Sequence, residues 1–268
     1  MNATCARVIF FALLLSGLAG GAKLIESSPE TSARSNSVAP AQAEFEKTEA
    51  AYRANNFGVA LLEQYRARDA VDSFTRALEI KPDLLIAQVN LAIALYYLPD
   101  LDRAKHEAEQ ALKRDPDRLQ ARYILGLIAR SQNRFDDAIS EFKKVLRVDP
   151  DDVGANVNLG QVFSQQKEYA PAFAAFRKAI EVEPYNETAL YNLGLLLTRT
   201  GDRTQGQQVL QKFQRLKESG AGTTVGPNYL EGGHYAEAIV STGAEAELVD
   251  STTPRVRLPT RKDDQKSA

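Results

Sequence analysis

The residue types that most often carry out catalysis or bind metals are scarce in this chain of 268 residues, which has one cysteine and two histidines. Zinc sites and imidazole proton relays need several such side chains close together. The pair His106-Glu107 begins like the helical zinc-protease motif, but Gln110 stands where that motif has its second histidine. We therefore expect His106 to be a surface residue, and we expect neither a metal ion nor a cofactor.

Other patterns that could carry chemistry also have simpler interpretations. Gly220, Gly222 and Gly226 lack the Lys-Ser/Thr pair of a phosphate-binding loop, so they indicate a linker. Acidic pairs such as Asp136-Asp137 stand where helices are expected to begin, and aspartate is favoured there as a cap. No nucleophile, base and orienting group can be assembled, so we predict that the protein is not an enzyme. A net charge of -2 also argues against a nucleic-acid partner.

The first 22 residues have the order of a secretory signal peptide. Arg7 precedes an apolar run, and small residues follow the run up to Ala22. The uncharged stretch, residues 8–22, is shorter than the ~20 residues that a membrane-spanning helix needs. We expect cleavage after Gly21 or Ala22, export to the periplasm or the medium, and no membrane span afterwards. The alternative is an uncleaved leader that tethers the protein to the membrane. Cys5 would be removed with the leader.

The middle of the chain is an internal repeat. Four prolines follow one another at intervals of 34 residues: Pro82, Pro116, Pro150 and Pro184. The sequences around them are also alike, reading ALEIKPD, ALKRDPD, VLRVDPD and AIEVEPY. A period of this length is typical of a solenoid in which each repeat packs only on its neighbours.

The period and the small residues resemble the tetratricopeptide repeat. Position 8 of that repeat is small, and here it is occupied by Gly58, Ala92, Gly126, Gly160 and Gly194. The matching repeats cover residues 51–84, 85–118, 119–152, 153–186 and 187–220. The resemblance implies an all-α fold, a right-handed superhelical solenoid of antiparallel helix pairs over residues 41–220, with the first helix beginning near Ala41.

The segments outside the solenoid are expected to be less regular. Residues 23–40 are rich in Ser, Pro, Thr and Ala and predict a flexible linker, and residues 251–268 predict a disordered tail. Residues 221–250 are interpreted as a linker and a degenerate capping helix. They resemble the turn and second helix of a sixth repeat, which would bury Tyr235 and Ile239 against the last full repeat. A transiently helical linker is the alternative.

The resemblance implies a concave groove lined by the first helix of every repeat. Position 6 of the repeat points into it, and four of the five repeats have asparagine there. A carboxamide can donate to a peptide carbonyl and accept from a peptide N–H, so such a ladder could hold an extended backbone. The alternative is that these are routine groove residues without a dedicated ligand. Their neighbours are apolar or tyrosine, which suit either partner binding or core packing. The predicted peptide-binding residues are Asn56, Asn90, Tyr96, Tyr123, Leu127, Asn158, Tyr191 and Asn192.

We therefore predict a non-enzymatic scaffold that binds a protein or peptide in the groove. Two alternatives stay open. One is the binding arm of a larger secreted or envelope enzyme or propeller assembly, because residues 228–250 resemble the segment that leads from such repeats into a β-propeller in some secreted bacterial proteins. In that alternative, the partner domain is absent or is encoded elsewhere. The other is a holdase for exported chains. The sequence does not indicate an oligomeric state.

Overall fold

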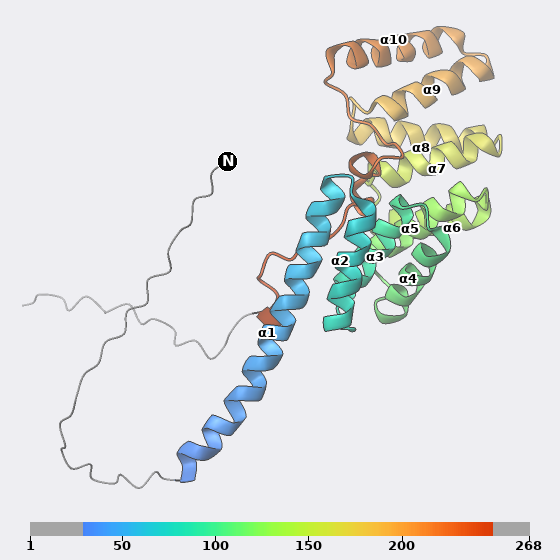
Figure 1. Ribbon diagram of the computed structural model, residues 1–268. Helices are drawn as coiled ribbons and strands as arrows, with labels where there is room; N and C mark the ends of the chain where they lie inside the picture. The colour runs from blue at the N-terminus through green and yellow to red at the C-terminus, as the bar shows by residue number, and fades with distance from the viewer. Residues whose placement is uncertain (1–28, 249–268) are drawn as a thin grey trace, which may run out of the picture. The chain divides into compact units, whose positions relative to one another are not determined.

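The computed structural model describes the backbone of residues 29–248 and the side chains of residues 42–248 (Figure 1). The chain divides into two units, residues 1–42 and residues 43–268, and the features below belong to the second unit except for the beginning of the first helix. The predicted signal peptide, residues 1–22, and the predicted tail, residues 251–268, lie outside the described residues. Within the described range, no helix is long and apolar enough to cross a membrane.

Over the residues that the structure describes, ten α-helices follow one another as five antiparallel pairs (Figure 1). The pairs are α1 (Pro29–Glu63) with α2 (Ala67–Ile80), α3 (Leu85–Tyr97) with α4 (Leu101–Arg114), α5 (Leu119–Ser131) with α6 (Phe135–Val148), α7 (Val153–Gln165) with α8 (Tyr169–Val182), and α9 (Glu187–Thr200) with α10 (Arg203–Ser219). The predicted starts of repeats two to five are the first residues of α3, α5, α7 and α9. The all-α solenoid is therefore confirmed.

Local side-chain chemistry fixes where several helices begin. Asp100, Asp152, Asn186 and Asp202 each cap a helix by accepting a hydrogen bond from the backbone N–H three residues later. Such a cap satisfies one of the backbone donors that a helix start leaves without a partner. The turn between the two helices of a repeat has its own signature. Position 15 has a positive φ in all five repeats, at Tyr65, Pro99, Asn133, Lys167 and Gly201.

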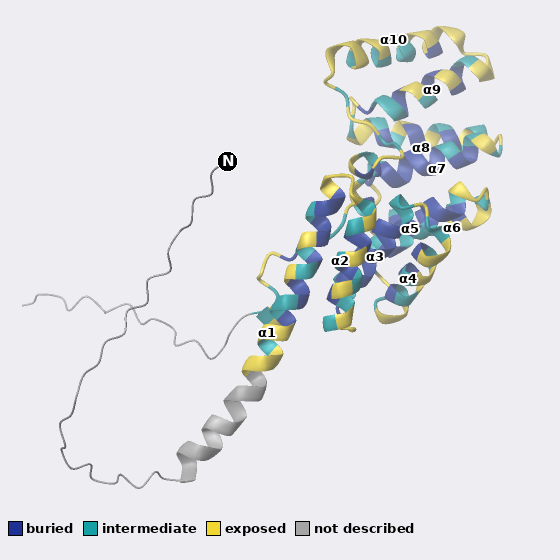
Figure 2. Ribbon diagram, in the orientation of Figure 1, coloured by how far each residue is buried: buried dark blue, intermediate teal, exposed yellow. Residues whose placement is uncertain are grey.

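The small residue at position 8 is required by a large residue at position 24 of the same repeat. A Cβ atom built on Gly160 would lie 2.7 Å from the ring of Phe176, and one built on Gly58 would lie 2.6 Å from the ring of Phe74. Both phenylalanines are fully buried, so their rings have no free space into which to move. Figure 2 shows more generally that α7 is largely buried, whereas α10 is largely exposed or half-buried. In the second repeat both positions are alanine, Ala92 and Ala108. The side chain at position 24 therefore sets the size allowed at position 8.

The first helix begins earlier than predicted. We expected a flexible linker over residues 23–40 and a helix from Ala41, but α1 starts at Pro29. Proline suits the first turn of a helix because its φ is already helical and it has no N–H to leave unpaired. Once the helix is established by packing further along, each additional turn costs little. Residues 29–40 are therefore helical and not a linker.

The predicted capping helix is wrong. After Gly220, whose φ of 64° ends α10, the chain contains only three short 3-10 turns up to residue 248: η1 (Tyr229–Glu231), η2 (His234–Ala236) and η3 (Ala246–Leu248). Glycine is among the poorest helix formers, and Gly232, Gly233 and Gly243 interrupt this segment. We call residues 223–248 the strap.

Candidate functional site: the concave groove and the strap

The strap runs along the first helices of the repeats, in the direction opposite to their order. Thr223 is bonded to the start of α9 in repeat five, Gly232 to α5 in repeat three, and Ser241 to α1 in repeat one. In Figure 1 it is the orange to red segment that passes beside α7 and then along α1. Tyr235 and Ile239 are half-buried in this groove, and they do not cap the last repeat as predicted.

The strap is anchored at repeat five by main-chain hydrogen bonds. The N–H of Glu187 donates to the carbonyl of Thr223 at 2.8 Å, and the N–H of Thr223 donates to the carbonyl of Tyr185 at 3.1 Å. The hydroxyl of Thr188 donates to the carbonyl of Val225 at 3.0 Å and accepts from its N–H at 2.9 Å. The chain is thus held in register at the point where it enters the groove.

Two asparagine carboxamides grip the far part of the strap by its backbone. Asn90 donates to the carbonyl of Ile239 and accepts from its N–H, both at 2.7 Å. Asn56 does the same with Ser241, at 2.9 and 2.8 Å. Asn55 donates to the carbonyl of Ile239 and to the side-chain oxygen of Asn56, and it accepts from Asn90. It therefore links the carboxamides of Asn56 and Asn90. The residue between the gripped pair, Val240, is 53% exposed. This part of the strap therefore has the alternation of an extended chain.

The middle of the strap passes close to α5 and α7. The Tyr123 hydroxyl donates to the carbonyl of Gly232 at 2.7 Å and accepts from the carboxamide of Asn158 at 2.9 Å. Tyr123 is fully buried, which raises the pKa of its phenol well above the usual value and keeps the hydroxyl protonated as a donor. Gly154 of α7 faces Gly233 here, and a Cβ on Gly154 would lie 3.2 Å from the Gly233 Cα. The two backbones therefore approach each other closely.

Tyr229 and Tyr235 of the strap pack on either side of the close approach at Gly233. The ring of Tyr229 packs edge-on against Tyr97, with centroids 5.3 Å apart, and its hydroxyl accepts from the N–H of Ala238 at 2.9 Å. The Tyr235 hydroxyl donates to the Asp149 carboxylate at 2.9 Å. Burial, and then this bond to a carboxylate, raise the pKa of Tyr235 to about 12. Both rings thus combine an apolar face with a satisfied polar end.

The predicted site residues divide into three groups. Asn56, Asn90 and Tyr123 bond directly to the strap, and Asn158 positions the Tyr123 hydroxyl. Tyr96 packs edge-on against Tyr97, and Leu127 is buried in the core cluster of the repeats. Tyr191 and Asn192 lie at the end of the solenoid, where Tyr191 packs on Phe213 and Asn192 donates to its own helix at Thr188. The structure therefore brings four of the eight together around the strap.

Several strap contacts come from residues outside the predicted set: Tyr52, Asn55, Tyr97, Asp149, Gly154 and Thr188. Two of them carry a signal in the sequence. Asn55 precedes a predicted groove asparagine, so it extends the carboxamide ladder. Gly154 stands at position 2, where the other repeats have a larger side chain, and this absence of a side chain marks a close approach.

A cavity of about 530 Å³ remains between the strap and the start of α7. Asp149, Asp152, Glu183 and Glu237 line it together with His234. Burial raises the pKa of Asp152 to about 6, although the bond from the Ala155 N–H lowers it. The carboxylate of Asp152, which caps α7, is therefore harder to ionise than that of an exposed aspartate.

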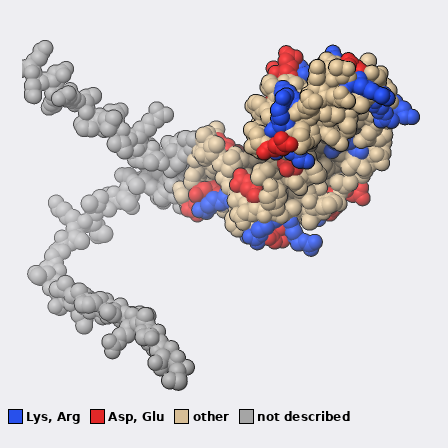
Figure 3. Space-filling view, turned by 90° about the horizontal axis from the view of Figure 1, so that it is seen from above, with Lys and Arg blue, Asp and Glu red and all other residues tan. Residues whose placement is uncertain are grey.

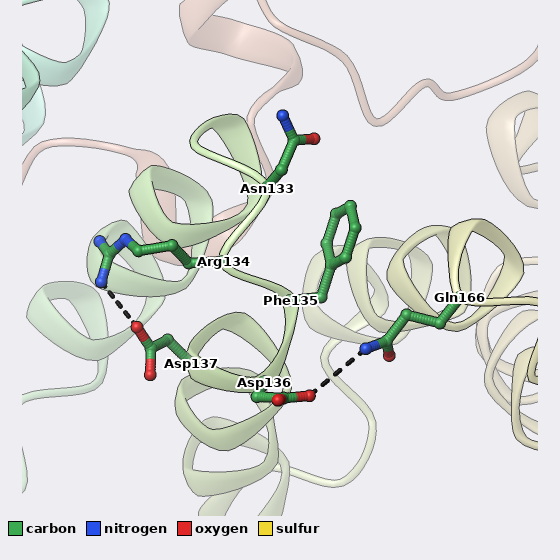
Figure 4. A pocket seen from close by; sticks show the side chains of 6 residues that line it. All are labelled: Asn133, Arg134, Phe135, Asp136, Asp137 and Gln166. Carbon is green, nitrogen blue, oxygen red and sulfur yellow. Dashed lines mark hydrogen bonds and ion pairs between the residues drawn. The ribbon is translucent and has the colours of Figure 1, made fainter.

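Other surfaces of the described residues are weaker candidates for a functional site. A surface hollow of about 320 Å³ lies where the α5–α6 turn meets the end of α7 (Figure 4). Its polar groups already bond to one another, Arg134 to Asp137 and Asp136 to Gln166. On the face seen in Figure 3, basic and acidic side chains form small groups among a larger uncharged surface. The concave groove is therefore the stronger candidate for a functional site than this hollow or this charged surface.

Comparison with known proteins agrees with this architecture. Family models described as tetratricopeptide repeat match residues 89–145, 129–187 and 188–216. No curated protein sequence matches the chain significantly.

Among solved structures, MamA from Desulfovibrio magneticus RS-1 superposes with a TM-score of 0.57 at 20% identity, over 63% of this chain and 96% of that one. The Pseudomonas aeruginosa pilF protein gives 0.59 at 22% identity, over 63% and 78%. At such identities the likeness concerns the fold alone. The repeats, their register and the family matches together identify this chain as a tetratricopeptide-repeat protein.

Proposed function

We propose that this protein is a non-enzymatic scaffold that binds an extended protein segment in its concave groove. A tetratricopeptide-repeat solenoid is in general a surface for protein–protein interaction. The observation that carries the finer proposal is the pair of two-way contacts from Asn56 and Asn90 to the backbone of the strap. These contacts involve only main-chain atoms of the bound segment, so the same carboxamides can hold another chain in the same way.

The strap competes with any such partner. It is part of the same chain, so its effective concentration at the groove is on the order of millimolar or higher. A partner therefore binds when the strap is weakened or displaced. Weakening the strap should therefore increase partner binding, whereas removing the groove carboxamides should decrease it.

The test compares capture of crosslinked proteins from the native host by three forms of the full chain. Gly233→Val weakens the strap and leaves the groove side chains intact, so it should capture more partner than the wild type. Adding Asn56→Ala and Asn90→Ala to it should abolish the gain. Asn192→Ala is the matched control, because Asn192 bonds only to Thr188 of its own helix among the contacts described. Capture that survives removal of the two carboxamides would contradict binding in the groove.

We further propose that the protein acts outside the cytoplasm. The support is the charged, apolar and small-residue order of residues 7–22. Mass spectrometry of the protein purified from its host should find an N-terminus near Lys23. A mature chain that still carries residues 8–22 would overturn cleavage and favour a membrane tether.

A further inference from the structure

We infer that the groove at repeats two to four is specific for a Gly-Gly step flanked by two tyrosines, and that the partner is a protein segment that presents this pattern in the conformation that the strap adopts. The inference rests on the proposed function and adds the sequence that the bound segment must have. The pattern is the one found in the strap, where Tyr229 lies three residues before Gly232 and Tyr235 lies two residues after Gly233.

The first glycine is required by the side chain that faces it. A Cβ atom on Gly232 would overlap the Tyr97 hydroxyl and would lie 2.8 Å from the Ala236 Cβ. Tyr97 cannot easily move aside, because its ring packs between Tyr96 and Tyr229. Any side chain at this position therefore pushes the segment out of the groove.

The second glycine is required by both its backbone and its surroundings. Gly233 has φ 98° and ψ 161°, a region that residues with a Cβ rarely adopt. A Cβ there would also lie 2.5 Å from the Tyr123 hydroxyl and 3.2 Å from the Gly154 Cα. The groove itself has no side chain at this point, since the residue of α7 that faces the strap is the buried Gly154. Glycine on the strap and glycine on α7 thus together allow the two backbones to approach closely.

The two tyrosines fix the register of the glycines. Tyr229 is 5% exposed and lies against Tyr97, while Tyr235 reaches the Asp149 carboxylate. The carboxamides of Asn56 and Asn90, by contrast, contact only main-chain atoms of the strap. The groove therefore has a part that holds backbone without regard to sequence and a part that selects Tyr-x-x-Gly-Gly-x-Tyr.

The test uses a fluorescent synthetic peptide of residues 223–248 and the full chain carrying Gly233→Val in its own strap. The wild-type chain should bind the peptide at least ~10-fold more weakly than this variant, because the tethered strap outcompetes it. A second full chain, carrying Tyr229→Ala and Tyr235→Ala, releases the strap without placing a branched side chain at the crowded point. Far-UV circular dichroism of both chains reports whether the helices are retained.

The peptide itself is then varied. Gly232→Ala and Gly233→Ala peptides should bind the released chains at least ~10-fold more weakly than the unmodified peptide, because the added Cβ meets the hydroxyl of Tyr97 or of Tyr123. A Val240→Ala peptide is the matched control and should bind within ~2-fold, because Val240 points away from the groove between the two gripped residues.

The outcomes separate the two proposals. If the glycine-substituted peptides bind as well as the unmodified one, the Gly-Gly specificity is wrong while groove binding stands. If no peptide binds either released chain, both proposals fail. If the peptide binds but Asn90→Ala in the released chain leaves its affinity unchanged, the peptide lies outside the groove and both proposals fail as well.

Discussion

Asn90 and Ile239 are 149 positions apart in the chain, yet they exchange two hydrogen bonds of 2.7 Å each. The carboxamide replaces the backbone partner that an extended chain would find in a neighbouring strand. Its second N–H donates to Asn55 at 2.8 Å, so both of its donors are used. Because Asn90 and Asn55 are fully buried, water does not readily take the place of a hydrogen bond that is broken here.

Substituting Asn90 should therefore loosen the strap locally. In Asn90→Ala, the N–H and carbonyl of Ile239 are left without their closest partners, and we expect amide hydrogen exchange at Ile239 to become at least ~10-fold faster, corresponding to about 1.4 kcal/mol or more. NMR-detected exchange on the full chain measures this. Asn192→Ala should leave Ile239 protected, since Asn192 bonds to Thr188 of its own helix. Unchanged protection at Ile239 in Asn90→Ala would show that the carboxamide does not hold the strap.

The relationship between position 8 and position 24 predicts a large loss of stability on substitution. Gly160→Leu should lower the free energy of unfolding by about 3 kcal/mol, because even its Cβ would lie 2.7 Å from the ring of Phe176. Urea denaturation measures the change.

The second repeat supplies the control for that prediction. Gly160→Ala combined with Phe176→Ala recreates its pair, Ala92 and Ala108. The double variant should lose less stability than the sum of the two single variants, because the added methyl group then meets no ring. If the losses are additive, Gly160 and Phe176 do not interact, which would contradict this contact.

The solenoid could be predicted from the sequence because its determinants are local and recur with a fixed period. The spacing of Pro82 and the later prolines follows from where each second helix ends, and the small residue at position 8 follows from a contact within one repeat. The proline recurs four times and the small residue five times, and each occurrence supports the others. The period therefore predicts the starts of α3, α5, α7 and α9 to the residue.

The strap could not be predicted in this way, because it occurs once and its partners are distant. In the sequence, Tyr235, Ala238 and Ile239 have the spacing of an amphipathic helix, and Gly232 and Gly233 resemble the turn that would precede it. Their actual partners belong to other repeats, and only the facing side chains reveal why glycine is needed there. The ladder of asparagines predicts a device for holding a backbone, but nothing in it indicates that the strap of the same chain bonds to these carboxamides.

The turn at position 15 offers a route to higher stability. Lys167 has φ 62°, a left-handed conformation that favours glycine. Lys167→Gly should raise the free energy of unfolding by up to about 1 kcal/mol, because the strain of holding a Cβ in this region is removed. Glu168→Gly is the matched control, since Glu168 has φ -82° and precedes α8. It should be neutral or destabilising. A loss of stability in Lys167→Gly, measured by thermal unfolding, would contradict the argument.

Asp152 should make the stability of the protein depend on pH between about 4 and 6. Burial raises its pKa from 3.8 to about 6 in the folded state, and nearby Asp149 and Glu183 act in the same direction while His234 opposes it. The folded state thus binds the proton more tightly than the unfolded state. The contribution of this group is greatest below pH 3.8 and is lost as the pH rises through about 6.

Asp152→Asn removes this dependence and keeps the helix cap. The amide oxygen of asparagine can still accept from the Ala155 N–H, and asparagine is as good a cap as aspartate. The variant should therefore gain stability relative to the wild type as the pH rises from 4 to 6. The gain should level off above pH 7 at no more than about 3 kcal/mol, since one pKa unit corresponds to about 1.4 kcal/mol. Thermal unfolding of both proteins from pH 4 to pH 8 measures the difference. A difference that is constant over this range would show that Asp152 ionises as it does in the unfolded chain.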